Sequence, residues 1–246
     1  MTGIELALGL AALIGIALGV LGGGGSIVTM PVLVYVAGID PKTAVGMSLA
    51  IVGGTSLAGS YLHYREQNFH GKAAGLFGAS GIVGAYFGAM LTHLVRSSVL
   101  MLSFAGLMLL VGILMLAGKP NRGGRCECHT WRCLVVGALV GSLTGFLGVG
   151  GGFLILPALV FTAGVETKKA IGSSLAIIAF NAAAGLLGQL RYIHIDWRLT
   201  LLFLIASLMG MAFGLAIVRR IPEHNLRLAF GCALLVIGGL IAYKNF

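Results

Sequence analysis

Two glycine-rich stretches contain the residues best suited to bind a ligand, GVLGGGGSIVTMP from Gly19 to Pro31 and GFLGVGGGFLILP from Gly145 to Pro157. A short apolar segment follows the glycines of each stretch. The first N–H groups of a helix have no partner within it and carry the positive end of its dipole. Because glycine lets a ligand approach the backbone closely, each stretch predicts a cradle for an anion. The candidate residues are Gly22, Gly23, Gly24, Gly25, Ser26, Gly148, Gly150, Gly151 and Gly152.

Two pairs of polar residues lie in the apolar segments that come next. Ser48 and Thr55 are seven residues apart, as are Ser174 and Asn181. Seven residues make nearly two helical turns, so the members of each pair are predicted to share a helix face. This face could contact the ligand, or it could pack against another helix with Ser and Thr hydrogen-bonding across the contact. The sequence leaves both interpretations open.

His63, Arg65 and Arg191 are candidates for a gating or proton-linked role. Arg65 and Arg191 stand at matching positions of two similar halves, and either could be the counter-ion of a bound anion. His63 could carry a proton near neutral pH. The alternative for His63 and Arg65 is a pair at a helix end whose polar groups reach towards the membrane surface.

Three of the four cysteines stand close together between the two halves, with a histidine among them. Cys and His are ligands of Zn²⁺, but the spacing in this group differs from the usual pairs of cysteines separated by two residues. Free thiols in a reducing compartment are the alternative. We therefore expect no metal or other cofactor, and the residues of this metal candidate are Cys126, Cys128, His129 and Cys133.

The chain contains an internal sequence repeat, in which the second half resembles the first. A shift of 126 residues without a gap matches 20 of the 47 positions from Gly19 to Arg65. Such self-similarity is typical of an internal structural repeat. The predicted organisation is a first repeat over 1–118, a basic Cys-containing linker over 119–133 and a second repeat over 134–246, together forming one membrane domain.

The composition indicates an integral membrane protein. Hydrophobic residues make up 58% of the chain and charged residues only 9%, which is too little polar surface for a soluble globule of 246 residues. The net charge of +9 comes from basic residues scattered between apolar runs, without a basic stripe or interleaved aromatics. Nucleic acid is therefore not an expected partner, and the positive charge is expected to set the membrane orientation.

Each half is predicted to contain five helical segments, of which the second is too short to cross a bilayer as a helix. Since the first two segments of each half join at the glycines, they predict a re-entrant or broken helical hairpin with its glycine tip inside the membrane. The alternative is a tight turn at the surface. The predicted segments are 3–21, 25–37, 43–63, 72–92 and 98–117, then 134–147, 151–163, 169–190, 198–218 and 225–243.

Counting Lys and Arg favours an inverted second half. If each half crosses the membrane an odd number of times, 11 of the 16 basic residues share the cytoplasm with the linker. An even number of crossings places 9 on that side. The fold class predicted is therefore an all-α polytopic membrane protein of two inverted-topology repeats, each with a glycine-tipped hairpin and three transmembrane helices. The 11 residues are Arg65, Lys72, Lys119, Arg122, Arg125, Arg132, Lys168, Lys169, Arg219, Arg220 and Arg227.

The position of the acidic residues points to an anion or a neutral solute. No Asp or Glu lies well inside a predicted span, whereas cation transporters and proton pumps usually need an acid within the membrane. An enzyme is not expected, because no group of nucleophile, base and orienting residue is visible.

The doubled glycine stretch followed by proline, the A-x-G-x-S-L-A pattern after it and the basic central linker resemble the TauE/SafE family, often called sulfite exporter proteins. The resemblance covers essentially the whole chain. It implies a multi-pass permease of the bacterial cytoplasmic membrane that exports sulfite, a sulfonate such as sulfoacetate, or a related sulfur oxyanion. The copies differ at Ser26 and Gly152, and at Gly23 and Val149, so the two cradles are not identical.

The function predicted is alternating-access transport of a small anion, sulfite or an organosulfonate, held between helix N-termini at the two glycine tips. The expected partners are this anion, the lipid bilayer and a second copy of the chain in a homodimer. Two alternatives remain open. One is a carrier of a neutral or cationic solute, including a metal ion, and the other is a membrane scaffold that transports nothing.

Overall fold

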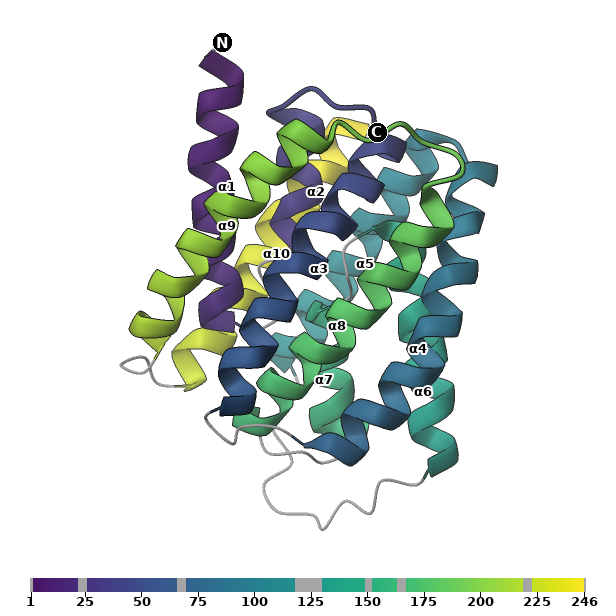
Figure 1. Ribbon diagram of the computed structural model, residues 1–246, viewed down its shortest axis with the longest axis vertical. Helices are drawn as coiled ribbons and strands as arrows, with labels where there is room; N and C mark the ends of the chain where they lie inside the picture. Colours follow the sequence, from purple (N-terminus) through teal and green to yellow (C-terminus); the bar gives the residue numbers. More distant parts are fainter. Residues whose placement is uncertain are drawn as a thin grey trace.

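The computed structural model describes residues 2–21, 26–65, 70–117, 130–148, 152–162, 167–218 and 223–245. Within these ranges the protein consists of α-helices and one short 3-10 helix, and it contains no strand (Figure 1). The prediction of an all-α fold is therefore confirmed. The helices are α1 (Thr2–Leu21), α2 (Ser26–Tyr35), α3 (Pro41–Arg65), α4 (Gly71–Leu91), η2 (Thr92–Leu94), α5 (Ser97–Ala117), α6 (Thr130–Leu147), α7 (Gly152–Thr162), α8 (Thr167–Gln189), α9 (Trp197–Val218) and α10 (Glu223–Asn245).

Two aspartates fix where long helices begin. The Oδ2 atom of Asp40 accepts a hydrogen bond from the backbone N–H of Lys42 at 3.0 Å, directly before α3. The Oδ1 atom of Asp196 accepts one from the backbone N–H of Leu199 at 3.1 Å, directly before α9. These carboxylates act as N-caps, and Pro41 occupies the first helical position, where its missing N–H costs nothing.

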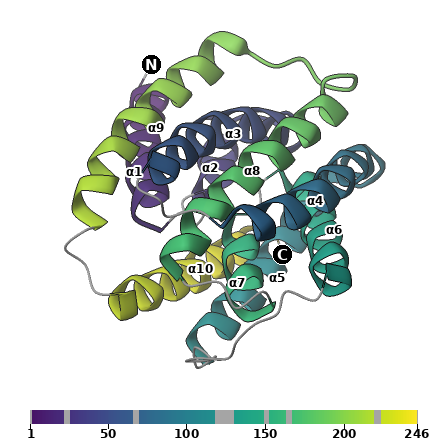
Figure 2. The ribbon, with the colours of Figure 1, turned by 60° about the horizontal axis from the view of Figure 1, so that its bottom comes forward.

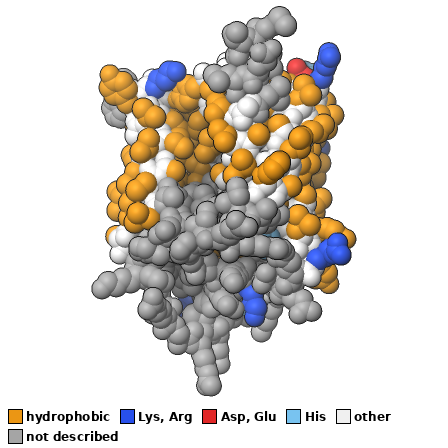
Figure 3. All heavy atoms as spheres, turned by 90° about the vertical axis from the view of Figure 1, so that its left-hand side faces the viewer, with side chains coloured by type: hydrophobic (Ala, Val, Ile, Leu, Met, Phe, Trp, Pro, Cys, Tyr) orange, Lys and Arg blue, Asp and Glu red, His pale blue; other side chains and the backbone are white. Residues whose placement is uncertain are grey.

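The outer surface of the bundle suits a lipid environment. In the part of the chain that the structure describes, five helices are long and apolar enough to cross a membrane. Figure 3 shows hydrophobic side chains along the described surface, with Lys and Arg gathered towards the two ends. Large apolar side chains project outward from most helices, among them Leu57, Val83, Phe87, Leu139, Leu187, Met209 and Phe213, each at least 57% exposed. The protein is a multi-pass membrane protein, as predicted.

The helices pair in a pattern that the two halves share. Helix α1 packs along α9, and α4 packs along α6, as both ribbon views show (Figures 1 and 2). Helix α3 packs on α8, and α5 on α10. Exchanging each helix for its equivalent in the other half, α1 for α6 and so on to α5 for α10, turns the first two pairs into each other. The pair of α3 with α8 and the pair of α5 with α10 are each unchanged by this exchange.

Individual contacts repeat in the same way. A Cβ atom placed on Gly59 would lie 3.1 Å from Cδ1 of Leu175, and one placed on Gly185 would lie 3.2 Å from Cδ1 of Leu49. Both members of the second contact stand 126 positions from their equivalents in the first. Two core clusters also contain equivalent residues at this offset, namely Ile14 and Val140, Leu33 and Leu159, Ala44 and Ala170, Ile51 and Ile177, and Phe77 and Phe203.

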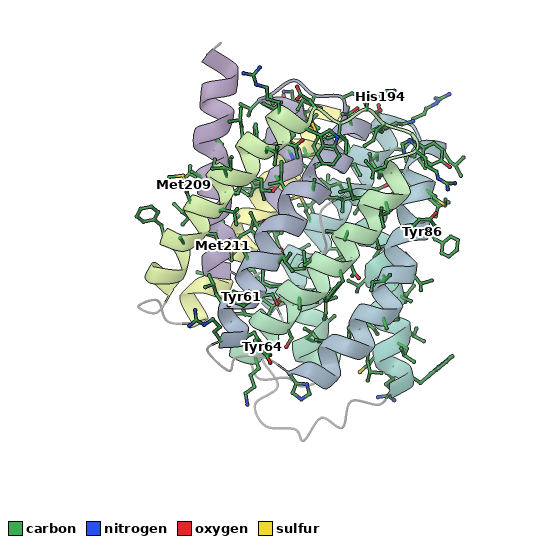
Figure 4. All side chains as sticks on the ribbon, in the orientation of Figure 1. Tyr61, Tyr64, Tyr86, His194, Met209 and Met211 are labelled. Atoms are coloured by element: carbon green, nitrogen blue, oxygen red, sulfur yellow. The ribbon has the colours of Figure 1, made fainter. Side chains whose placement is uncertain are left out.

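Equivalent helices run in opposite directions across the bundle. In Figure 1, α1 begins at the upper end, whereas α6 begins at the lower end. The lower end also holds the last residues of α3, α5 and α9 and the first residues of α4, α8 and α10. Tyr61 and Tyr64 lie near this end of α3, and His194 lies at the upper end (Figure 4).

The close helix contacts predict a large difference between two glycine substitutions. A Cβ on Gly145 of α6 would lie 2.7 Å from the backbone Cα of Ala85 in α4, so Gly145→Ala should destabilise the protein by about 1 to 3 kcal/mol. Gly106 of α5 has open space, so Gly106→Ala should be neutral or stabilising by about 0.5 to 1 kcal/mol. Thermal unfolding in detergent measures both, and equal midpoints would contradict the packing described here.

Candidate functional site

Helices α3 and α8 position the polar residues singled out in the sequence. Ser48 and Thr55 lie in α3, and Ser174 and Asn181 lie in α8. All four side chains are at most 1% exposed, although each helix also carries outward-facing apolar residues. The members of each pair therefore lie on the inner face of one helix, as predicted from their spacing.

Two of these four side chains are satisfied within their own helix. The Oγ1 atom of Thr55 donates a hydrogen bond to the carbonyl oxygen of Ile51 at 2.8 Å. The Oγ atom of Ser174 donates to the carbonyl oxygen of Ile171, also at 2.8 Å. Such bonds to the preceding turn are the usual way for a hydroxyl to be paired within a helix. These two residues are already paired without a ligand.

The other two have no partner among the residues that the structure describes. These are the Oγ atom of Ser48 and both polar atoms of the Asn181 amide. The hydroxyl groups of Thr29 in α2 and Ser56 in α3 are likewise buried and unpaired. Leaving a buried polar group unpaired costs about 1 to 3 kcal/mol, so such groups mark a place where a ligand or water is expected to complete the bonding.

The Asn181 amide packs closely against a glycine on the neighbouring helix. Helix α4 packs against α8, and Gly81 of α4 faces the amide. A Cβ atom on Gly81 would lie 2.7 Å from both Nδ2 and Oδ1 of Asn181. Any other residue at this position would crowd the amide, so this is a point where the absence of a side chain matters.

Three described residues next to the tips of the glycine stretches, Ser26, Gly148 and Gly152, are buried. Gly148 follows α6 with φ of +69°, a left-handed conformation that favours glycine, and a Cβ there would lie 2.6 Å from the Cα of Val45 in α3. Ser26 and Gly152, the first residues of α2 and α7, are both buried, and these two short helices contact each other. The predicted tip residues Gly22, Gly23, Gly24, Gly25, Gly150 and Gly151 lie outside the described residues.

The structure does not bring the two candidate arginines to this buried region. Arg65 is the last residue of α3 and Arg191 lies in the turn after α8; both are exposed, at opposite ends of the bundle. His63 is buried one half-turn before the end of α3. A role for these residues as gating or proton-linked groups stays a prediction.

The structure describes one residue of the cysteine cluster, Cys133, and this residue is not the free thiol that was expected. Cys133 is fully buried near the start of α6 and is disulfide-bonded, so its sulfur is not available as a thiolate ligand. Cys126, Cys128 and His129 lie outside the described residues. Within the described ranges, no group of three or more His, Cys, Asp and Glu side chains could hold a metal ion.

A polar cluster that sequence reasoning missed lies at the upper end of the bundle. Gln189, the fully buried last residue of α8, donates from Nε2 to the carbonyl oxygen of Ala89 at 3.2 Å. Its Oε1 atom lies 2.6 Å from Nε2 of His93 in η2, and the His93 ring stacks on Tyr192 with centroids 4.4 Å apart. We call the contact of His93 with Gln189 the clasp. Its one sequence signal is that Gln189 is the equivalent of His63.

The clasp lies next to the end of α6, the first helix of the second predicted hairpin. The Oγ1 atom of Thr92, next to His93, donates to the carbonyl oxygen of Phe146 at 2.8 Å, one residue before α6 ends. The clasp and this bond therefore tie η2 to the ends of both α8 and α6. The unpaired C=O groups at the end of a helix need such partners when protein covers them.

The chain matches the family model described as "Sulfite exporter TauE/SafE" over residues 7–241. The chain belongs to the TauE/SafE family. A relative from Xylella fastidiosa (strain 9a5c), named probable membrane transporter protein, is 32% identical, with the alignment covering 97% of this chain and 95% of the relative. The probable membrane transporter protein YdhB of Bacillus subtilis is 27% identical, with coverage of 94% and 97%. No solved structure matches the chain.

This TauE/SafE protein is a membrane transporter. The family description and the names of the relatives are those of transporters rather than enzymes, which agrees with the prediction from the sequence. A transporter has to bind its solute and release it, and the unpaired groups on α2, α3 and α8 are candidate contacts for that solute.

The difference between paired and unpaired hydroxyls predicts opposite effects on stability. Ser174→Ala removes a hydrogen bond and should cost about 0.5 to 1.5 kcal/mol. Ser48→Ala removes an unpaired hydroxyl, so the unfolding midpoint should stay the same or rise. Thermal unfolding of the ligand-free protein compares these equivalent positions. A larger loss for Ser48→Ala would mean that its hydroxyl has a structural partner.

Proposed function

We propose that this TauE/SafE protein transports a small anion, sulfite or an organosulfonate such as sulfoacetate, by alternating access. The observation that carries the proposal is that the neutral polar side chains of Thr29, Ser48, Ser56 and Asn181, on helices α2, α3 and α8, are each buried and without a hydrogen-bond partner among the described residues. The family description supports a sulfur oxyanion as the solute class.

The distribution of charge supports an anion rather than a cation. In the described helices, acidic residues occur only as Glu5 and Glu223, the fourth residue of α1 and the first of α10. A cation inside a membrane protein usually requires an acidic partner. Neutral hydroxyl and amide donors, together with backbone N–H groups, can hold an anion and still release it.

The alternating-access part of the proposal rests on the two halves being inverted repeats. The recurrence of helix pairs and contacts at one offset supports this, as does the opposite direction of α1 and α6. Two copies of one unit that lie in the membrane with opposite orientations can supply an inward and an outward gate around a central site.

Helices α2 and α7 would supply the positive field for the anion. Both begin at buried residues after a glycine stretch, and they contact each other within the bundle. Each helix N-terminus acts roughly as half a positive charge and offers free N–H groups. Removing an anion from water costs several kcal/mol or more, so two such termini would offset much of this cost.

A flux measurement in proteoliposomes tests the proposal directly. The purified protein should carry at least one of sulfite, thiosulfate, sulfoacetate, taurine and sulfate faster than protein-free vesicles. Flux of none of them would favour a scaffold without transport activity. Flux of metal ions or neutral solutes alone would favour the other alternative.

The backbone cradle predicts that steric blockage matters more than side-chain removal. Gly24→Leu and Gly150→Leu should abolish binding of the carried anion, while Ser26→Ala should weaken it by about 1 kcal/mol, the contribution of one hydrogen bond. Calorimetric titration measures all three. Complete loss of binding in Arg65→Gln or Arg191→Gln, with binding kept in a leucine variant, would refute the cradle.

The charge count predicts which end faces the cytoplasm. In a background with the four native cysteines replaced by alanine, Tyr64→Cys and His194→Cys place thiols at exposed positions of opposite ends. In intact right-side-out cells an impermeant maleimide should label position 194 and leave position 64 unlabelled until the membrane is opened. The reverse pattern would overturn the orientation.

A further inference from the structure

We infer that the carried anion also bears a hydrogen-bond donor, and that the side-chain oxygen of Asn181 recognises this donor. The inference rests on the proposed function, because it concerns the ligand of the same buried region. It adds to that function a specificity-determining residue and a narrower class of ligand, which includes hydrogensulfite and excludes fully deprotonated sulfoacetate.

The Asn181 amide is the polar group with the greatest unmet bonding capacity in the described core. It is 1% exposed, and both Oδ1 and Nδ2 lack a partner among the described residues. The amide packs against the backbone of Gly81 in α4, where a Cβ would lie 2.7 Å from both polar atoms. The group is therefore buried, unpaired and faced by a position without a side chain.

The equivalent place in the other half is closed by internal hydrogen bonds. The equivalent of Asn181 is Thr55, which bonds to the carbonyl oxygen of Ile51 at 2.8 Å. The equivalent of Gly81 is Ser207, whose Oγ atom donates to the carbonyl oxygen of Ala11 at 3.1 Å. The polar side chains of Thr55 and Ser207 are hydrogen-bonded, whereas the equivalent Asn181 amide is not bonded to any described residue. The unpaired amide is therefore a feature of this half and not a requirement of the fold.

An amide needs both a hydrogen-bond donor and an acceptor from its ligand, whereas a hydroxyl can be satisfied by an acceptor alone. The hydroxyls of Thr29, Ser48 and Ser56 can each turn a hydrogen towards an anionic oxygen. The amide of Asn181 presents both donors and an oxygen that only accepts, whichever way it is turned. A fully deprotonated oxyanion would pair with the nitrogen and leave the oxygen unpaired in a dry environment.

The ligand chemistry that satisfies both atoms is an anion with its own donor. A singly protonated oxyanion has this property, and so does a small sulfonate or carboxylate that carries a hydroxyl or ammonium group. A site built to pair with such a group rejects an analogue that lacks it, because its own polar atoms then stay unpaired.

Competition between two nearly isosteric sulfonates tests the inference. Flux of the anion that the wild-type protein carries is measured against 2-hydroxyethanesulfonate and against propane-1-sulfonate, in which a methyl group replaces the hydroxyl. The hydroxylated compound should compete about tenfold or more strongly, the effect of pairing one buried polar group. In Asn181→Thr, which introduces the residue of the equivalent position, this ratio should fall to about one.

A glycine pair supplies a matched control that leaves Asn181 in place. Gly81→Ala crowds the amide and should also remove the preference, whereas Gly78→Ala, one turn earlier in α4 with open space around it, should keep the preference. Thermal unfolding of each variant shows whether it is folded, so the glycine pair decides the question if Asn181→Thr fails to fold.

Three results would overturn the inference while leaving anion transport intact. They are equal competition by the two sulfonates in the wild-type protein, competition by neither, and a preference that survives in both Asn181→Thr and Gly81→Ala. Absence of any anion flux in the wild-type protein would instead overturn the proposed function, and this inference with it.

Discussion

The architecture depends on helix backbones that approach each other without side chains between them. A Cβ on Gly141 would lie 2.6 Å from the Cα of Gly81, and one on Gly15 would lie 2.8 Å from the Cα of Ser207. These contacts hold α6 against α4 and α1 against α9. Because a bilayer cannot satisfy exposed backbone groups, the ends of helices within a membrane protein need such enclosure. Helices α3 and α8 are packed between these pairs, so their inner faces are withdrawn from lipid.

The same enclosure gives buried polar groups their energetic weight. In water the hydroxyl of Ser48 and the amide of Asn181 would be solvated, but inside the bundle they have to find partners in the protein or in the solute. A solute that satisfies them gains their bonding and does not have to displace a charged side chain. Neutral contacts of this kind suit a carrier, which must bind its solute and then let it go.

Much of the fold could be predicted from the sequence, because apolar runs and glycine breaks are local signals. The interruption after Leu21 and the one around Gly148 were predicted at those places. The pairing state of Ser48 and Ser174 could not be, since identical residues at equivalent positions differ only in what surrounds them. The contact of Gly81 with Asn181 and that of His93 with Gln189 join residues about 100 positions apart, so they depend on helix rotation and pairing.

The clasp makes the two ends of this duplicated protein unequal. The equivalents of His93 and Gln189 are Arg219 and His63, so a different pair of side chains stands at these positions of the first and second halves. A carrier of two identical halves would spend equal time open to each side. Under the proposed mechanism, a difference of about 1 kcal/mol between these two pairs would favour one resting conformation roughly fivefold. Duplication would then supply the two conformations, and side chains that differ between the halves, such as this pair, would set the balance between them.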